Sequence, residues 1–303
     1  MVTKHHPKIL IIGGSGFLGK HLISTLSKSG YQLRIPTRNR ERAKGHIIII
    51  PDTELIQFDL GKNLEFGELF RGIDIVINCL GILHKIKKND FDRFHIDLVR
   101  KIVNYCNKFN VERLIHVSAL KASTSAASEY LRSKAHGESV IQRELSEDIK
   151  SHILRPSVIF GEDDSFLSMF KKLGDILPVI PLAMPCAKFQ PVYVKDVVRC
   201  ISNCIEGIEP RQEIDLCGPK QYELIELVRY ATKFSRYPTV ILKLPNLIAF
   251  AQAYIFEILK IRLLTRDNLY SMRVDSVGDV SICAEDSRAL RAMEEIGPKY
   301  LSN

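Results

Sequence analysis

The sequence has no apolar run long enough to cross a membrane. Its longest uncharged apolar run covers residues 244–256, well short of the roughly 20 residues that a membrane-spanning helix requires. The N-terminal stretch MVTKHHPK also lacks the apolar core of a secretory signal. We therefore expect a cytoplasmic protein that does not span a membrane, and the sequence leaves peripheral attachment to the cytoplasmic membrane open.

Signatures of nucleic-acid binding and of metal binding are missing as well. Without zinc-finger spacing, an RNP-like motif or a helix-turn-helix pattern, the formal charge of +8 does not indicate nucleic acid, and an anionic small ligand explains it more simply. The seven cysteines are scattered, which suits a reducing compartment. Cys200 and Cys204 could form half of a metal site, but no second pair accompanies them. We expect both on a buried helix face, and no metal site.

Apolar runs and amphipathic segments alternate in the first half of the chain. Hydrophobic residues make up 46% and charged residues 26%, which is typical of a globular protein. Short apolar runs that predict buried strands lie at residues 8–13, 31–37, 54–60, 74–81, 111–119 and 151–161. Helical patterns follow at residues 17–30, 93–110 and from 129 onward. This alternation predicts the α/β class, with a doubly wound parallel sheet that carries helices on both faces.

The stretch GGSGFLG closes the first predicted strand and opens the first predicted helix. Its three spaced glycines would permit a tight turn, let the backbone approach a pyrophosphate, and let helix and strand pack closely. The N-terminus of the helix would offer free N–H groups to the phosphates. We therefore predict a Rossmann fold that binds a dinucleotide. The cofactor-binding residues predicted in this loop are Gly13, Ser15, Gly16, Phe17, Leu18 and Gly19.

The end of the second predicted strand, RIPTRNRER, indicates which dinucleotide is bound. An NAD site usually places a carboxylate roughly 20 residues past the glycines, but here no acidic residue precedes Glu41, and Arg38 takes that place. A guanidinium can grip a 2′-phosphate with two hydrogen bonds. We predict that NADP(H) is preferred and leave NAD(H) open. The other arginines of the stretch are expected to be solvent-exposed charges; they are Arg34, Arg40 and Arg42.

A carboxylate ends the third predicted strand, in the stretch QFDL. Asp59 could accept a hydrogen bond from the adenine amino group, and a turn or helix cap is the alternative.

The stretch YLRSK places Tyr130 and Lys134 four residues apart on a predicted helix, so both would point from one face. The ammonium could lower the pKa of the phenol, which would make Tyr130 a usable acid or base, and it could also bond the nicotinamide ribose. Of ten tyrosines, only Tyr130 has a lysine four residues on. Ser118, at the end of a predicted strand, could orient a substrate oxygen.

The order of these motifs resembles the extended short-chain dehydrogenase/reductase family. The stretches GGSGFLG, NCLG, HVSA, YLRSK, LRPSVIFG and FQPVYVKDV occur in that order. Within the family the chain is similar to the atypical branch that contains the accessory nucleotide-binding subunit of respiratory complex I and its bacterial relatives. The more specific likeness lies in SALKASTSAASEYLRSKAHGE and in the tail LLTRDNLYSMRVDSV, and the whole likeness covers residues 8–277.

The resemblance implies roles for individual residues. It implies the three glycines at the pyrophosphate, Arg38 at the ribose phosphate and Asp59 at adenine. Further cofactor-binding residues implied by it are Leu60, Asn78, Gly81, Tyr130 and Lys134. Ser118, Tyr130 and Lys134 would form the catalytic set. The loop SALKASTSAASE before the tyrosine departs from sugar-modifying members, because it is short and rich in alanine.

The second half of the chain is less regular and predominantly helical after residue 218. We predict an NADP-binding Rossmann domain at residues 1–218, with a lobe insertion near 161–189, and a smaller, mostly helical lobe for a substrate or partner at 219–303. The apolar helix PNLIAFAQAYIFEILKIRLL is expected to be buried in this lobe. The basic residues beside it leave an anionic membrane surface as the alternative; they are Lys243, Lys260 and Arg262.

Three functions follow from these features. The first is an oxidoreductase that passes hydride to or from a carbonyl or alcohol of an unknown small molecule, with Tyr130 as acid or base. The second is a non-catalytic nucleotide-binding accessory protein of a respiratory or quinone-related membrane complex. The third, less favoured, is a nucleotide-sugar epimerase or dehydratase. A homodimer is left open for all three, and no nucleic-acid partner is expected.

Overall fold

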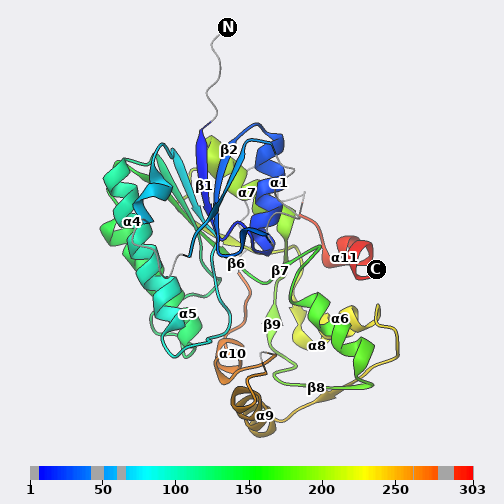
Figure 1. The fold of residues 1–303 in the computed structure, drawn as a ribbon. Coiled ribbons are helices and arrows are strands. Elements are labelled where there is room, and N and C mark those ends of the chain that lie inside the picture. Colours follow the sequence, from blue (N-terminus) through cyan, green and yellow to red (C-terminus); the bar gives the residue numbers. More distant parts are fainter. Residues whose placement is uncertain (1–6, 42–50, 60–65, 262, 279–289, 303) are drawn as a thin grey trace. The chain divides into compact units, whose positions relative to one another are not determined.

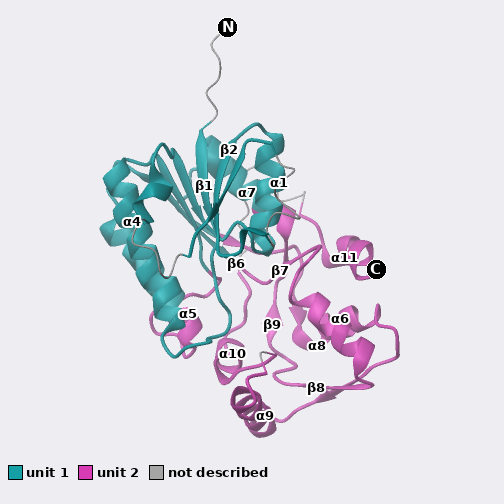
Figure 2. Ribbon diagram, in the orientation of Figure 1, with its two compact units in different colours: residues 1–118, 133–155, 198–214 teal, residues 119–132, 156–197, 215–303 magenta. Residues whose placement is uncertain are grey.

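The computed structural model describes residues 7–41, 51–59, 66–261, 263–278 and 290–302 (Figure 1). The predicted cofactor residue Leu60 and the arginines Arg42 and Arg262 lie outside them. The chain divides into two compact units, each built from separate segments (Figure 2). Unit 1 comprises residues 1–118, 133–155 and 198–214, and unit 2 comprises residues 119–132, 156–197 and 215–303. The predicted division at residue 218 stays a prediction.

Unit 1 is built on a seven-stranded sheet in the order β11-β6-β5-β4-β1-β2-β3. The strands are β1 (Lys8–Ile12), β2 (Gln32–Thr37), β3 (Thr53–Gln57), β4 (Ile75–Asn78), β5 (Arg113–Val117), β6 (Lys150–Pro156) and β11 (Glu213–Leu216). The pairings from β3 through β6 are all parallel. The order 3-2-1-4-5-6 is that of a doubly wound nucleotide-binding sheet, so the predicted fold class is confirmed.

Helices cover both faces of this sheet, as predicted. Figure 1 shows α4 (Leu98–Phe109) on one face and α1 (Phe17–Lys28) on the other. Alternate strand residues such as Leu10 and Val76 share a buried cluster with the apolar side of α4 and with Val140 of α5 (Glu129–Glu144), because successive strand side chains point to opposite faces. The remaining helical elements of this part are η1 (Phe66–Phe70), α3 (Asp90–Asp92), the π-helical turn η2 (Arg93–Asp97) and α7 (Val194–Glu206).

Unit 2 is held together by short strand pairs and helices. The parallel pairs are β7 (Ile159–Phe160) with β10 (Val192–Tyr193), and β8 (Val179–Leu182) with β13 (Val240–Lys243). The pair β9 (Lys188–Phe189) and β12 (Tyr222–Glu223) is antiparallel. The helices are α6 (Leu167–Ile176), α8 (Leu224–Thr232), α9 (Asn246–Ile258), α10 (Arg266–Ser271) and α11 (Met293–Leu301).

Helix α9 is not buried, which corrects the prediction made from its apolar sequence. Only Ala249 and Ala253 of this helix are buried, while Leu247 is 83% exposed and Ile258 is 60% exposed. The helix packs through its alanines on Ala183 and Leu269, so the larger side chains stay outside. None of the described helices combines the length and apolar character needed to cross a membrane.

Candidate functional site: the glycine loop and helix α5

The glycine loop leaves its backbone open at the N-terminus of α1. Gly13 has a φ of +87°, and a Cβ there would come within 2.7 Å of the Leu80 nitrogen. A Cβ on Gly19 would meet the carbonyl oxygens of Gly13 and Gly14, so the first turn of the helix lies directly on the loop. Gly16 is exposed, and its N–H donates to the Gly13 carbonyl at 3.0 Å. No acidic side chain stands in the first turn of α1, so this cradle suits a pyrophosphate.

Arg38 and Asp59 follow the carboxyl ends of the neighbouring strands β2 and β3. The Gln57 side chain donates to the Arg38 carbonyl at 2.8 Å and accepts from the Arg40 N–H at 2.9 Å. It therefore holds the turn after β2 against β3. The Arg38 side chain is exposed and Asp59 is half-buried. No role was predicted for Gln57, and its positioning role emerges only once β2 and β3 are paired.

Arg34 is not a solvent-exposed charge, contrary to the prediction. Its side chain is 11% exposed, and Nε lies 2.8 Å from a carboxylate oxygen of Glu54. Nη1 donates to the carbonyls of Leu69 and Arg71 at 3.1 and 2.8 Å. The register that pairs Arg34 with Glu54 across β2 and β3 creates this contact. These contacts give the Arg34 side chain a structural role. Arg40, by contrast, is exposed as predicted.

Lys134 is buried in unit 1 at the end of β5. Its Nζ donates to the Val117 carbonyl at 3.0 Å, and a Cβ on Gly81 would lie 3.3 Å from Nζ. Gly81 thus leaves the room that the ammonium occupies. Burial lowers the pKa of Lys134 to about 8, while the charges of Glu138 and Cys79 act in the opposite direction. The ammonium form still predominates at neutral pH.

Two buried histidines for which no role was predicted lie close enough to this lysine in unit 1 for its charge to lower their pKa values. His116 Nδ1 lies 3.0 Å from the Asn78 amide nitrogen, and among the described atoms His116 Nε2 has no hydrogen-bond partner. His95 Nδ1 lies 2.8 Å from the Ser133 hydroxyl, and its Nε2 accepts from the Ile82 N–H at 3.2 Å. Burial, followed by the Lys134 charge, lowers the pKa of His116 to about 3 and that of His95 to about 2. Both rings are therefore neutral. The sequence signal for His116 is a polar residue inside an apolar strand.

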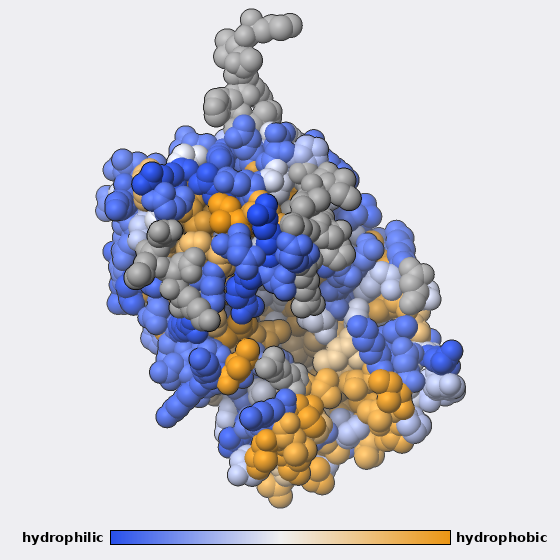
Figure 3. Space-filling model, viewed as in Figure 1, coloured by the Kyte–Doolittle hydropathy of each residue, from blue (hydrophilic) through white to orange (hydrophobic). Residues whose placement is uncertain are grey.

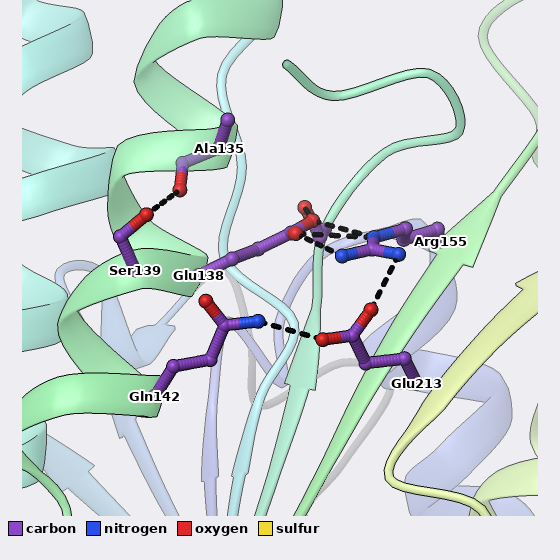
Figure 4. Close-up of polar contacts among 7 residues, drawn as sticks. Ala135, Glu138, Ser139, Gln142, Arg155 and Glu213 are labelled. Carbon is purple, nitrogen blue, oxygen red and sulfur yellow. Dashed lines mark hydrogen bonds and ion pairs between the residues drawn. The ribbon is translucent and has the colours of Figure 1, made fainter. Parts of the chain in front are cut away.

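Ser118 is engaged in a buried polar network. Its hydroxyl donates to the Glu138 carboxylate, and Arg155 grips the same carboxylate through Nε, at 3.0 and 3.1 Å. Arg155 also pairs with Glu213 at 2.8 Å, and Gln142 donates to Glu213 at 2.6 Å (Figure 4). Because its proton goes to Glu138, the Ser118 oxygen has only acceptor capacity left for a substrate.

Tyr130 lies in the first turn of α5 and belongs to unit 2. Asp267, from α10, accepts the backbone N–H groups of Glu129 at 2.6 Å and Tyr130 at 3.1 Å, and the Ser128 hydroxyl at 3.1 Å. Burial, then the Asp267 charge, raises the pKa of Tyr130 to about 12. The lowering that we expected from Lys134 is therefore not found. The phenol is protonated at neutral pH, which makes it a proton donor rather than a base.

Helix α5 carries both members of the predicted pair. Tyr130 is assigned to unit 2 and Lys134 to unit 1, and their four-residue spacing puts them on one side of a single helix. In the parts of the chain that the structure describes, no group of three or more histidine, cysteine, aspartate or glutamate side chains could hold a metal ion. Helix α5 therefore carries a phenol that can donate a proton and, one turn later, a buried ammonium.

Residues 9–216 match the family model described as the NAD dependent epimerase/dehydratase family. The chain is 32% identical over 226 residues to mouse mitochondrial NADH dehydrogenase [ubiquinone] 1 alpha subcomplex subunit 9. The aligned residues make up 73% of this chain and 59% of the mouse protein. It is 25% identical to ceramide reductase of Caulobacter vibrioides, over 81% of this chain and 76% of the relative.

A solved structure shares the fold. It is UDP-glucuronic acid 4-epimerase of Bacillus cereus, in complex with a UDP-sugar derivative and NAD, with a TM-score of 0.63 and 21% identity. The match covers 78% of this chain and 86% of that one.

Proposed function

The chain belongs to the NAD dependent epimerase/dehydratase family, and we propose that it is an NADP(H)-dependent oxidoreductase acting on a carbonyl or alcohol. The observation that carries the proposal is helix α5, which holds a protonated phenol, Tyr130, one turn before a buried ammonium, Lys134. A neutral acid and a cation four residues apart on one helix suit a reduction in which an oxygen gains a proton.

The residues divide the reaction between them. When bound, the nicotinamide supplies the hydride that a carbonyl carbon accepts. The C=O electron pair moves to the oxygen, which takes the proton of the Tyr130 hydroxyl, so that an alcohol forms. Lys134, whose ammonium donates to the Val117 carbonyl, would hydrogen-bond the ribose hydroxyls of a bound cofactor and would stabilise the phenolate left on Tyr130.

The cofactor half of the proposal rests on the glycine loop and on the turn after β2. The loop provides exposed backbone around Gly16 and a close approach at Gly13, which fits a pyrophosphate. Arg38 stands exposed where an NAD site would carry a carboxylate, and this supports NADP(H) over NAD(H). Asp59 is assigned to adenine, and Asn78 and Gly81 to the nicotinamide half.

The test is turnover by the purified protein. NADPH-loaded protein is mixed with long-chain carbonyls, quinones and UDP-sugars, and loss of NADPH fluorescence is followed. Long-chain carbonyls come first because one relative is named ceramide reductase. Tyr130→Phe should abolish oxidation and retain NADPH binding, whereas Tyr237→Phe, at a tyrosine that is 55% exposed, should behave as wild type. Unchanged turnover in Tyr130→Phe would remove Tyr130 from the mechanism.

A second candidate is a nucleotide-binding accessory protein of a respiratory membrane complex. Two observations favour it: the 32% identity to a NADH dehydrogenase subunit, and the Ser118 proton already donated to Glu138, which weakens the substrate-orienting role predicted for Ser118. The candidate predicts a cytoplasmic protein on the membrane surface that holds NADPH tightly without oxidising it. Tight binding without oxidation in wild type and Tyr130→Phe, with recovery in the membrane fraction, would select it over the first candidate.

A further inference from the structure

One face of the strand pair β8–β13 is apolar and exposed. The register pairs Val240 with Val179 and Leu242 with Pro181, and the two-residue period of strands places all four side chains on one face. Val240 is 65% exposed and Leu242 is 54% exposed, while Ile180 and Leu182 on the other face are buried. A solvent-facing sheet normally alternates apolar with polar residues, so this face is unusual.

Helix α9 continues directly from β13 and has its large apolar side chains on the outside. Ala249 and Ala253 face inward. On the opposite side of the helix, at the spacings that one face requires, exposed apolar residues are Leu247, Ile248, Tyr254, Ile255 and Ile258, and the exposed Leu259 follows at the C-cap. In a helix on a water-exposed surface the outer face is polar. In α9 the outer face is apolar instead.

The face of β8–β13 and the outer face of α9 are together called the apolar face. Figure 3 shows hydrophobic residues gathered over the part of unit 2 that holds these elements. Exposed patches of this kind mark surfaces that meet another molecule or a membrane.

The charges beside the apolar face are positive. Lys243 precedes α9 and Lys260 follows it; both are exposed, and neither pairs with a carboxylate among the described residues. Two described carboxylates of unit 2, Asp175 and Glu257, are held in ion pairs. Asp175 pairs with Lys171 at 3.3 Å, and Glu257 pairs with Arg266 at 2.8 Å. An apolar face flanked by free lysines complements an apolar layer under an anionic surface.

We propose that the apolar face docks unit 2 on the surface of an anionic lipid bilayer, with α9 lying in the interface. The outer side chains of α9 would enter the boundary of headgroups and acyl chains, while the two lysines would meet the headgroup anions. The proposal does not require Tyr130 to be catalytic, and it holds equally for an oxidoreductase and for an accessory protein.

The expected strength follows from the side chains involved. Fully burying one leucine or isoleucine changes an equilibrium by about tenfold to 100-fold. One lysine near an anionic surface contributes roughly fivefold, and this part is lost as salt rises. The apolar face should therefore bind anionic vesicles measurably and neutral vesicles much more weakly.

The experiment is flotation of the full chain with phosphatidylcholine vesicles that contain or lack phosphatidylglycerol. Wild type should float with the anionic vesicles and be released by salt. Leu247→Glu combined with Ile255→Glu should lower partitioning by more than about 100-fold. Lys243→Gln combined with Lys260→Gln should lower it on anionic vesicles by roughly 25-fold, since each lysine contributes about fivefold.

The control is Ile208→Glu, at an isoleucine of unit 1 that is 48% exposed; it should leave flotation unchanged. NADPH binding, measured on every variant, reports folding and separates this proposal from the proposed function. Absence of wild-type flotation, or equal losses in Ile208→Glu and Leu247→Glu, would overturn the proposal. A third outcome would also overturn it: wild type does not bind vesicles, light scattering shows a dimer, and Leu247→Glu dissociates that dimer. A second copy of the chain would then cover the apolar face.

Discussion

Asp267 should be the residue that keeps the first turn of α5 in place. Its carboxylate accepts two backbone N–H groups, at 2.6 and 3.1 Å, and the Ser128 hydroxyl at 3.1 Å. Loss of a side-chain cap costs about 0.5–2 kcal/mol, and loss of a carboxylate at a helix N-terminus costs about 0.3–1 kcal/mol. We expect Asp267→Ala to lower the free energy of unfolding by about 2 kcal/mol. Asp267→Asn, which keeps an acceptor and loses the charge, should cost about 1 kcal/mol.

The assay is urea unfolding of the two variants beside Asp275→Ala, which removes a single acceptor for the Lys188 N–H and should cost no more than about 1 kcal/mol. A second measurement tests the effect of the Asp267 charge on the pKa of Tyr130. Because Asp267 raises the pKa of Tyr130, Asp267→Asn should lower that pKa, as measured by NMR of labelled tyrosine. Equal losses of stability in all three variants, with the Tyr130 titration unmoved, would refute the capping argument.

Three further predictions concern the cofactor. Gly19→Ala should weaken NADPH binding more than about tenfold, because its Cβ would meet loop carbonyls. Gly72→Ala strains a backbone with a φ of +64° but has nothing within 4 Å of the added Cβ, so it should lower stability and leave NADPH affinity unchanged; equal losses of affinity would argue against the cradle. Arg38→Ala should cost NADPH roughly tenfold to 100-fold in fluorescence titrations and spare NADH, with Arg71→Ala as the control; parallel losses for both cofactors would reject a 2′-phosphate contact. NADPH affinity should fall as pH rises through about 8, where Lys134, with its lowered pKa, loses its proton; Lys134→Met should flatten this step, and an unaltered profile would assign it to another group.

Local sequence patterns were sufficient to predict the sheet and the glycine loop. The strands around Ile11 and Ile77 are buried on both sides and therefore consist of uninterrupted apolar runs. The glycine loop needs residues without a Cβ at Gly13 and Gly19, so its spacing is visible in the sequence itself. These features depend on neighbours within one strand, turn and helix.

Contacts between distant segments could not be predicted in this way. The partnership of Ser118 with Glu138, and of Tyr130 with Asp267, depends on which helix end meets which residue far along the chain. Helix α9 shows a second limit. Its composition favours burial, but only the side that carries Ala249 and Ala253 is buried. Composition does not reveal which side of a helix faces the protein interior.

The Glu138–Arg155–Glu213 network constrains how the protein can vary. Glu138 is 5% exposed, and it faces a guanidinium on β6 that is also bound by a carboxylate on β11. Replacing Arg155 alone would leave the buried Glu138 carboxylate without its cationic partner, at a cost of about 3–5 kcal/mol, so related chains should change Glu138 and Arg155 together or not at all. Anyone who transplants the Tyr130–Lys134 helix into another scaffold would have to transplant Arg155 and Glu213 with it, because the helix carries half of an ion pair whose other half belongs to the sheet.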